Sequence, residues 1–180
     1  MSRLSIPTRD EAPAASQPLL DAVGRKLGVV PNMFKLIGHS PAGLEAVLGL
    51  NGGLGRTLDV RTRERIALAV AAVNGCDYCM SAHSYLATNL AKLDAAEVAA
   101  NRAGHSNDAK ADAAVVFARK VAEARGKVSD GDLAAVRSAG YGEAEIVEIV
   151  LVVAENFLTN LMNNVAQTDI DFPVVLADAA

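Results

Sequence analysis

The sequence of 180 residues has no tryptophan, only two cysteines and no excess of basic residues. Two cysteines cannot form the disulfide framework that stabilises many small secreted domains. Seventeen Lys and Arg against 21 Asp and Glu give a net charge of −4. That balance argues against a protein that binds nucleic acid through a basic surface. The hydrophobic fraction of 51%, together with this small net charge, argues against a disordered chain.

Long apolar runs are also missing. The longest covers residues 66–73, and the run at 149–154 is shorter still; both are far short of the roughly 20 residues that span a bilayer. Residues 1–11 contain no apolar core, so they do not predict a signal peptide. We therefore expect a soluble, cytoplasmic protein without membrane partners. In a reducing compartment, two nearby cysteines are more often catalytic or metal-binding than a structural bridge.

Alanine is abundant, with 34 residues or about 19% of the chain, whereas aromatic residues make up 4%. This composition is typical of packed helices and not of a β-sandwich or barrel. Helix start and stop signals recur along the chain, and no segment reads as a strand, repeat or interdomain linker. The sequence predicts an all-α fold of about eight or nine helices, with an N-terminal arm over residues 1–15 and a single helical domain over residues 16–180. The expected helices cover residues 16–27, 31–37, 40–50, 61–74, 76–90, 94–103, 108–125, 129–139 and 143–166.

The chemistry-bearing side chains cluster within residues 61–90. Cys79 and His83 are four positions apart, so their side chains share one face of a helix. Cys76 falls in the same first turn, where unpaired backbone N–H groups favour a thiolate. Glu64 lies on the preceding helix and returns beside this turn if the two helices pack antiparallel. A thiolate, a base and a second thiol would then meet, which is what thiol-based reduction of a peroxide requires.

These four residues carry a family resemblance. Glu64, Cys76, Cys79 and His83, with twelve positions from the glutamate to the first cysteine, resemble the site of the AhpD-like alkylhydroperoxidases in the carboxymuconolactone decarboxylase superfamily. The resemblance implies an AhpD-like helical bundle and a homotrimer or homohexamer. It also implies a thiol peroxidase site that uses no metal, flavin, haem or other cofactor.

The wider sequence supports this resemblance and departs from it at one position. Residues 63–70 and 74–83 look like the same family, and residues 30–35 are similar to its peroxidase-related members. The similar core covers about residues 40–100. The family pattern has a histidine immediately before the second cysteine, where this chain has Tyr78. A proton relay through that histidine is absent, or Tyr78 replaces it as a hydrogen-bond donor; Tyr78 is otherwise expected to form a pocket wall.

The resemblance assigns roles, with alternatives left open. Cys79 is expected to attack the peroxide because His83 is its partner one turn away, and Cys76 would resolve the product. Glu64 would orient or deprotonate His83. Small hydroperoxides would be the substrates, and an unidentified dithiol or protein the reductant. The alternatives are a disulfide oxidoreductase or redox sensor that acts on a protein, a carboxymuconolactone-decarboxylase-like lyase, and a non-catalytic oligomeric module.

Simpler interpretations remain for the individual residues. Cys76 and Cys79 could be small buried side chains in an alanine-rich bundle, or two ligands of a zinc site that also uses His83. Glu64 could merely stabilise the first turn of its helix. The predicted helix over residues 143–166 is apolar almost all round, which predicts burial at the centre of the molecule or at a subunit interface. Its row of asparagines, at positions 156, 160 and 163 or 164, could be a polar seam, an oligomer contact or a lining of the approach to the site.

Overall fold

The computed structural model describes residues 2–177. Within them it contains nine α-helices and no strand, as the composition predicts. Residues 2–16 form no helix. The helices are α1 (Gln17–Leu27), α2 (Asn32–Ile37), α3 (Pro41–Leu54), α4 (Val60–Val73), α5 (Asp77–Asn89), α6 (Ala95–Arg102), α7 (Ala109–Glu123), α8 (Asp130–Ser138) and α9 (Glu143–Ala166). None of these is long and apolar enough to cross a membrane.

Polar side chains fix where most of the helices begin. Each accepts a hydrogen bond from a backbone N–H group of the first turn, which has no partner within the helix. The helix α3 is longer than expected, because it continues through Gly52 and Gly53 and stops only before Gly55. The capping side chains belong to Ser40, Asp59, Asp94, Asp108 and Ser129.

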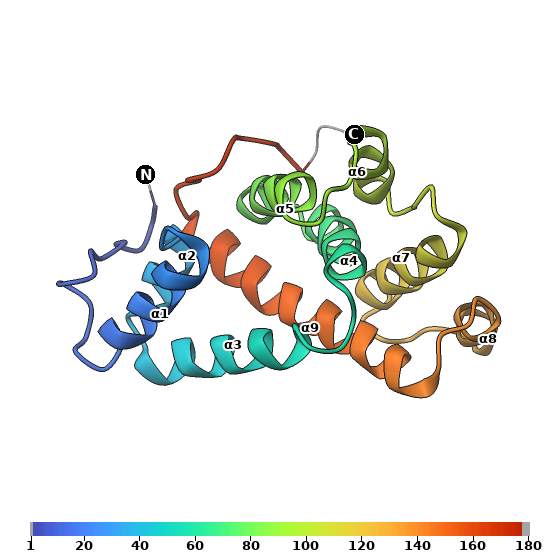
Figure 1. Ribbon diagram of the computed structural model, residues 1–180, viewed down its shortest axis with the longest axis horizontal. Helices are drawn as coiled ribbons and strands as arrows, with labels where there is room; N and C mark the ends of the chain where they lie inside the picture. Colours follow the sequence, from blue (N-terminus) through green and yellow to red (C-terminus); the bar gives the residue numbers. More distant parts are fainter. Residues whose placement is uncertain (1, 178–180) are drawn as a thin grey trace.

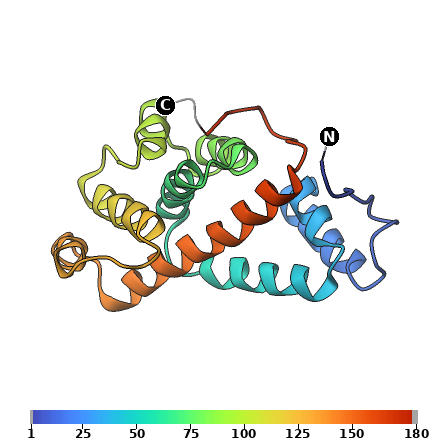
Figure 2. The same ribbon diagram turned by 180° about the vertical axis from the view of Figure 1, so that it is seen from behind.

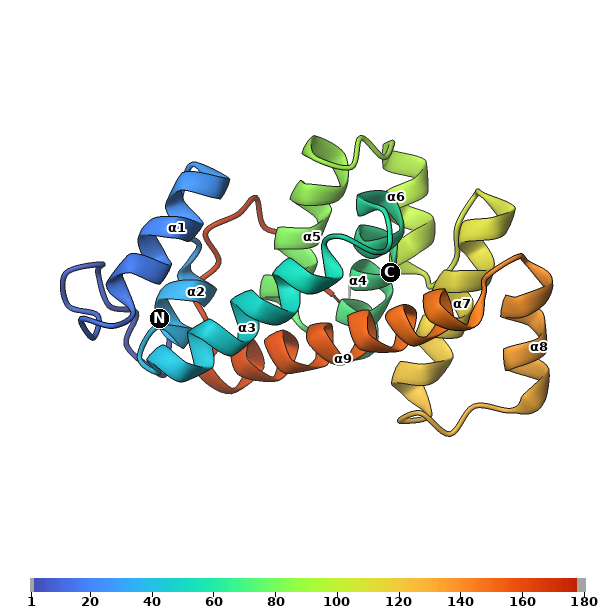
Figure 3. The same cartoon turned by 60° about the horizontal axis from the view of Figure 1, so that its bottom comes forward.

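The long helix α9 runs through the middle of the molecule, and the other helices lie around it (Figure 1). The helix α3 lies along one side of α9. The helices α1 and α2 pack beside α3, near the C-terminal end of α9. The helices α4, α5 and α7 pack against the other side of α9, and α8 lies near its N-terminal end (Figure 3). The helix α4 is central, because it packs against α5, α6, α7 and α9.

The apolar core has three parts that meet around this centre. One lies between α4, α7, α8 and α9 and contains Ile66 and Ile149, both fully buried. A second, between α4, α5 and the C-terminal segment, contains Cys76 and Cys79. The third joins α1, α2 and α3. The two cysteines therefore sit inside the packed protein and not on its surface.

One side of α9 is not covered by the chain. Its apolar side chains include Val147, Leu151, Leu158, Leu161 and Val165, which are between 41% and 63% exposed. Ala154 is exposed on the same stripe. The spacing of three and four residues alternates along the helix, which is the spacing of a helix–helix seam. The prediction that the helix over residues 143–166 is buried on every side is therefore wrong for a single chain.

The segment after α9 crosses the cysteine-bearing helix. Gln167, in the left-handed conformation with φ 46°, ends α9. From there residues 168–177 pass over α5 towards α6 (Figures 1 and 2). Ser81 of α5 holds this segment, because its hydroxyl donates to the carbonyl of Val175 and accepts from the N–H of the same residue.

Candidate active site

The two cysteines sit at the turn between α4 and α5. Gly75 has φ 57° and permits the tight reversal, since a side chain disfavours that conformation. Cys76 follows as the N-cap of α5, and its sulfur accepts the backbone N–H of Cys79 at 3.4 Å. Cys76 is 0% exposed and Cys79 is 2% exposed. Both are free thiols, held close together where the helix has unpaired N–H groups.

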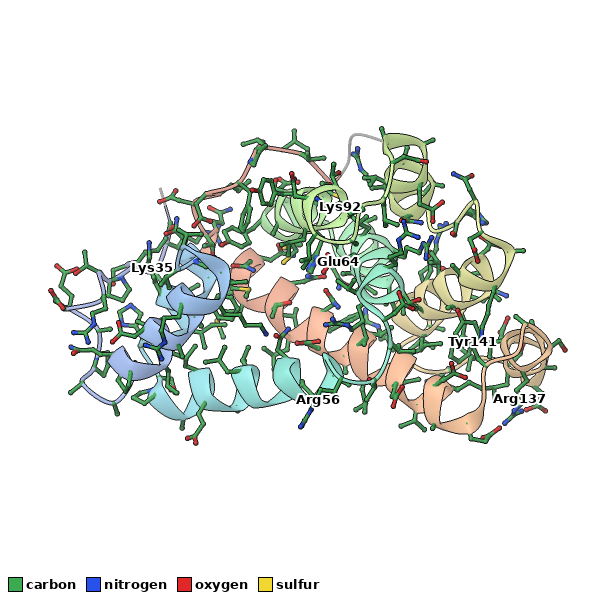
Figure 4. All side chains as sticks on the ribbon, viewed as in Figure 1. Lys35, Arg56, Glu64, Lys92, Arg137 and Tyr141 are labelled. Atoms are coloured by element: carbon green, nitrogen blue, oxygen red, sulfur yellow. The ribbon has the colours of Figure 1, made fainter. Side chains whose placement is uncertain are left out.

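The reversal also brings α5 back along α4. As a result His83 Nδ1 lies 2.8 Å from Glu64 Oε2. Figure 4 shows Glu64 at the centre of the molecule, beside α5. A carboxylate at Glu64 accepts the proton of Nδ1, which leaves Nε2 as the nitrogen that can take up or release a proton. Nε2 has no hydrogen-bond partner within residues 2–177.

The pKa of His83 is raised by this arrangement. Burial opposes the imidazolium charge, but the carboxylate of Glu64 more than offsets it through its charge and its hydrogen bond. Glu155, on α9, adds to the rise through its charge. The pKa of Glu155 is itself raised by burial, although it accepts a hydrogen bond from Asn51 at 3.0 Å.

The two thiols differ in acidity. A hydrogen bond from the Cys76 thiol lowers the pKa of Cys79 to about 7 against the effect of burial. The charge of His83 and a hydrogen bond from Asn163 act in the same direction. The pKa of Cys76 is raised, because its thiol donates that hydrogen bond and is buried. Of the two sulfurs, Cys79 is thus the one that holds a negative charge near neutral pH.

Asn163 joins α9 to this pair. Its Nδ2 lies 3.3 Å from the sulfur of Cys79, and the residue is 2% exposed. Asn160, one turn earlier, accepts a hydrogen bond from Asn74 Nδ2 at 2.8 Å and also lowers the pKa of Cys79. Asn160 and Asn163 therefore face the cysteines and the α4–α5 turn, whereas Asn156 bonds within its own helix.

Tyr78 points away from the two thiols. Its hydroxyl donates to Asp171 Oδ1 at 2.8 Å and accepts the backbone N–H of Met33 at 3.1 Å. Its ring meets Phe172 edge-on, with centroids 5.9 Å apart. Burial raises the pKa of Tyr78. Its hydroxyl makes no hydrogen bond to Cys76 or Cys79, so it does not occupy the role of a proton donor to them in this conformation.

The described residues do not support a zinc site at the cysteine pair. Within residues 2–177, no group of three or more His, Cys, Asp and Glu side chains is placed to hold a metal ion. The sulfurs of Cys76 and Cys79 instead interact with each other, with a backbone N–H and with an amide.

Comparison with known proteins relates part of the chain to one family. Residues 41–124 match the Carboxymuconolactone decarboxylase family. A solved structure from Ralstonia eutropha JMP134, described as an alkylhydroperoxidase AhpD core and an uncharacterized peroxidase-related protein, is 28% identical. It covers 94% of this chain and 92% of its own, with a TM-score of 0.83. Residues 41–124 thus resemble the Carboxymuconolactone decarboxylase family, and the chain as a whole has the AhpD-like fold.

Other solved structures share this AhpD-like fold. A peroxidase-related protein from Silicibacter sp. TM1040 is 25% identical over 93% of this chain and 91% of its own, with a TM-score of 0.81. The debrominase Bmp8 is 22% identical over 94% of this chain and 91% of its own, with a TM-score of 0.77. No curated protein matches the sequence. The AhpD-like fold of this chain is thus shared with peroxidase-related proteins and with a debrominase.

The sequence places Glu64, Cys76, Cys79 and His83 in one segment, and the structure brings their side chains together between α4 and α5. The sequence did not indicate the contact between Asn163 and Cys79, because Asn163 lies 84 positions away along the chain on another helix. The only signal in the sequence was a row of asparagines in an otherwise apolar helix.

Proposed function

We propose that this AhpD-like protein is a thiol-dependent peroxidase. The Cys79 thiolate attacks the terminal oxygen of a hydroperoxide, so that an S–O bond forms and the O–O bond breaks. The leaving alkoxide takes a proton from His83 and departs as an alcohol. The Cys76 thiol then condenses with the sulfenic acid, which forms a disulfide and releases water. An external dithiol or protein supplies two electrons and two protons to restore the thiols.

The observation that carries this proposal is the placement of two free thiols in one helical turn, close to the Glu64–His83 pair. The attacking sulfur must be a thiolate, and the resolving sulfur must keep its proton until the sulfenic acid has formed. Cys79, with its pKa lowered to about 7, and Cys76, with its pKa raised, meet these two needs. The Glu64–His83 pair supplies a proton donor one helical turn along α5.

The direction of the pH dependence follows from these shifts. The thiolate of Cys79 is lost as the pH falls through about 7, so reactivity should fall there and not near the ordinary thiol value of about 8.5. The raised pKa of His83 keeps the imidazolium present to higher pH than a free histidine would allow. Reactivity should therefore rise through about pH 7 as the thiolate forms and fall again at higher pH, where the His83 imidazolium is lost.

The test is a thiol titration before and after one equivalent of hydroperoxide, followed by turnover with a dithiol reductant. We expect the loss of both thiols in a single step and steady consumption of peroxide. Thiol–disulfide cycling without peroxide turnover would favour an oxidoreductase or redox sensor that acts on a protein. Redox-inert cysteines would leave a lyase or a non-catalytic module.

The same assay separates related chemistries on this fold. The likeness to the debrominase Bmp8, at 22% identity, extends to the fold alone, and incubation with a bromopyrrole should release no bromide. A lactone decarboxylase would not need the cysteine pair. Exchange of both cysteines for serine should abolish peroxide turnover in our proposal and spare a decarboxylation.

We also propose that the protein works as a homotrimer or homohexamer. The exposed stripe on α9 supports this, because an apolar face of this length is unusual on a monomer. Symmetric self-association is the common way to cover such a face.

A further inference from the structure

Glu155 of α9 is a half-buried carboxylate that none of the proposed reaction steps uses. Val152 and Thr159, one turn before and one turn after it on the same face of the helix, are 1% and 8% exposed. That face of α9 is therefore turned into the protein. Glu155 Oε1 accepts a hydrogen bond from Asn51 Nδ2 at 3.0 Å, so the packing of α3 on α9 fixes where the carboxylate lies.

Glu155 has no cationic side chain in direct contact. Carboxylates that are withdrawn from water are usually paired with a positive side chain. None of the ion pairs formed among residues 2–177 includes Glu155, and its side-chain partner is the neutral amide of Asn51. A carboxylate kept in this position without a contacting cation calls for an explanation.

The charges that act on Glu155 come from α4 and α5. Burial and the charge of Glu64 raise the pKa of Glu155, whereas the hydrogen bond from Asn51 and the charges of His83 and Arg63 lower it. In return, the charge of Glu155 raises the pKa of His83. The imidazole on α5 is therefore stabilised in its charged form by two carboxylates, Glu64 from α4 and Glu155 from α9.

The other charged groups around α5 are few. On α5 itself, the thiolate of Cys79 also favours the charged form of His83. The helix α6 also packs on α5, but its buried carboxylate, Glu97, is paired with Arg65 at 2.7 Å. Asp171, in the segment that crosses α5, accepts a hydrogen bond from a tyrosine hydroxyl of that helix. Glu155 is thus the second carboxylate that acts on the imidazole.

We propose that Glu155 is a positioning residue of the active site. Its carboxylate, held by Asn51 where α3 packs on α9, stabilises the His83 imidazolium and so sets the upper pH limit of peroxide reduction. This inference rests on the proposed peroxidase function and adds to it the residue that determines its alkaline limit.

The proton transfer explains why a second carboxylate is useful. Only the imidazolium can give the proton on Nε2 to the leaving alkoxide, which departs as an alcohol, and the neutral imidazole then takes a new proton from the solvent. Glu64 holds Nδ1 through a direct hydrogen bond at 2.8 Å. Glu155 acts through its charge alone, so it favours the imidazolium without occupying Nε2. As the pH rises, the imidazolium should persist further with both carboxylates than with Glu64 alone.

The first test follows His83 directly, by NMR titration of the imidazole Cε1–Hε1 groups in the reduced protein. The chain has three histidines, and the exposed His39 and His105 serve as internal references. Glu155→Gln keeps the shape of the side chain and an oxygen for Asn51 but removes the charge. We expect it to lower the midpoint of the His83 titration by about 0.5 or more and to leave the curves of the two references unchanged.

Glu148→Gln is the matched control. Glu148 lies two turns before Glu155, about 10 Å away along the same helix, so the substitution removes the same charge at a distance where salt screens it. The His83 titration should stay within about 0.2 of the wild type. Glu155→Asp, which retains the charge, should lie closer to the wild type than Glu155→Gln.

Two outcomes of this titration would overturn the proposal. One is a midpoint that falls by less than about 0.5 in Glu155→Gln, and the other is an equal shift in Glu148→Gln. Glu155→Met, with a side chain of similar length and no charge, serves the same test if the glutamine variant does not fold.

The second test asks whether the protonation of His83 limits the reaction. The pH profile of kcat/KM for tert-butyl hydroperoxide should fall on its alkaline side at a lower pH in Glu155→Gln, by the amount seen in the NMR titration, and Glu148→Gln should keep the wild-type profile. An alkaline side that stays in place while the His83 titration moves would overturn the proposal. A wild-type protein that reacts with no peroxide would instead refute the proposed function, and the NMR titration would still decide whether Glu155 stabilises the imidazolium.

Discussion

The contact between Asn163 and Cys79 gives the sharpest quantitative prediction. The substitution Asn163→Leu removes the amide that donates to the sulfur at 3.3 Å and keeps a side chain of similar length. A hydrogen bond to a charged group contributes about 1.5–3 kcal/mol. Because one pKa unit corresponds to about 1.4 kcal/mol, the pKa of Cys79 should rise by about one to two units.

The consequence for the rate follows directly. With its pKa at about 7, Cys79 is about half ionised at pH 7. A rise of one to two units reduces the thiolate to roughly a tenth to a hundredth of the thiol population. Peroxide reactivity at pH 7 should fall by about five- to fiftyfold, and alkylation by iodoacetamide, which needs only the thiolate, should recover much of its loss above pH 9.

The assay is the pH dependence of iodoacetamide alkylation in a Cys76→Ser background, where Cys79 is the single thiol and the introduced serine retains a hydroxyl donor. Asn156→Leu is the control, since that buried amide donates to the carbonyl of Val152 in its own helix and not to a thiol. A Cys79 pKa that moves by less than half a unit in the Asn163 variant would refute the role assigned to this amide.

Three further predictions concern the base, the assembly and the core. His83→Ala should lower peroxide reactivity at pH 7 by roughly ten- to a thousandfold through loss of the proton donor, and stopped-flow kinetics that match the wild type would show that the helix terminus alone activates the thiol. Light scattering at micromolar concentration should report a trimer or hexamer, and Leu161→Glu should shift it to smaller species; a wild-type monomer of 18.7 kDa would contradict the assembly. Ile66→Ala should lower the free energy of unfolding by about 2–5 kcal/mol, because this side chain is fully buried between α4 and its neighbours, and urea denaturation with a smaller loss would show that the site repacks.

The helices could be predicted from the sequence because their signals are local. Asp94, Asp108 and Ser129 each cap the helix expected to follow them, and the last helix has the predicted bounds of Glu143 and Ala166. The end of α3 could not be placed, since Gly52 and Gly53 carry only a modest cost within a helix that packs on α9.

The candidate site was predictable only where its residues are close in the chain. The segment with Glu64, Cys76, Cys79 and His83 is a helical hairpin, so spacing alone indicates which side chains can meet. Asn163 reaches the same place through the packing of α9 on α5. Periodicity within one helix does not state what that helix packs against.

Tyr78 illustrates the same limit from within the motif. Its position between the cysteines suggested a hydrogen-bond donor to the thiols or a pocket wall. The choice depends on Asp171 and Met33, which hold its hydroxyl at 2.8 and 3.1 Å. Both partners lie outside the local segment, so the orientation of the side chain is a tertiary property.

The central claim is that Cys79 is the sulfur that attacks the peroxide. It is tested most directly by mass spectrometry of the Cys76→Ser protein after one equivalent of tert-butyl hydroperoxide, with dimedone to trap a sulfenic acid. We expect one dimedone adduct on Cys79 and none on Cys76 in the reciprocal Cys79→Ser protein. An adduct on Cys76 in the Cys79→Ser protein, with Cys79 unmodified in the other variant, would contradict it.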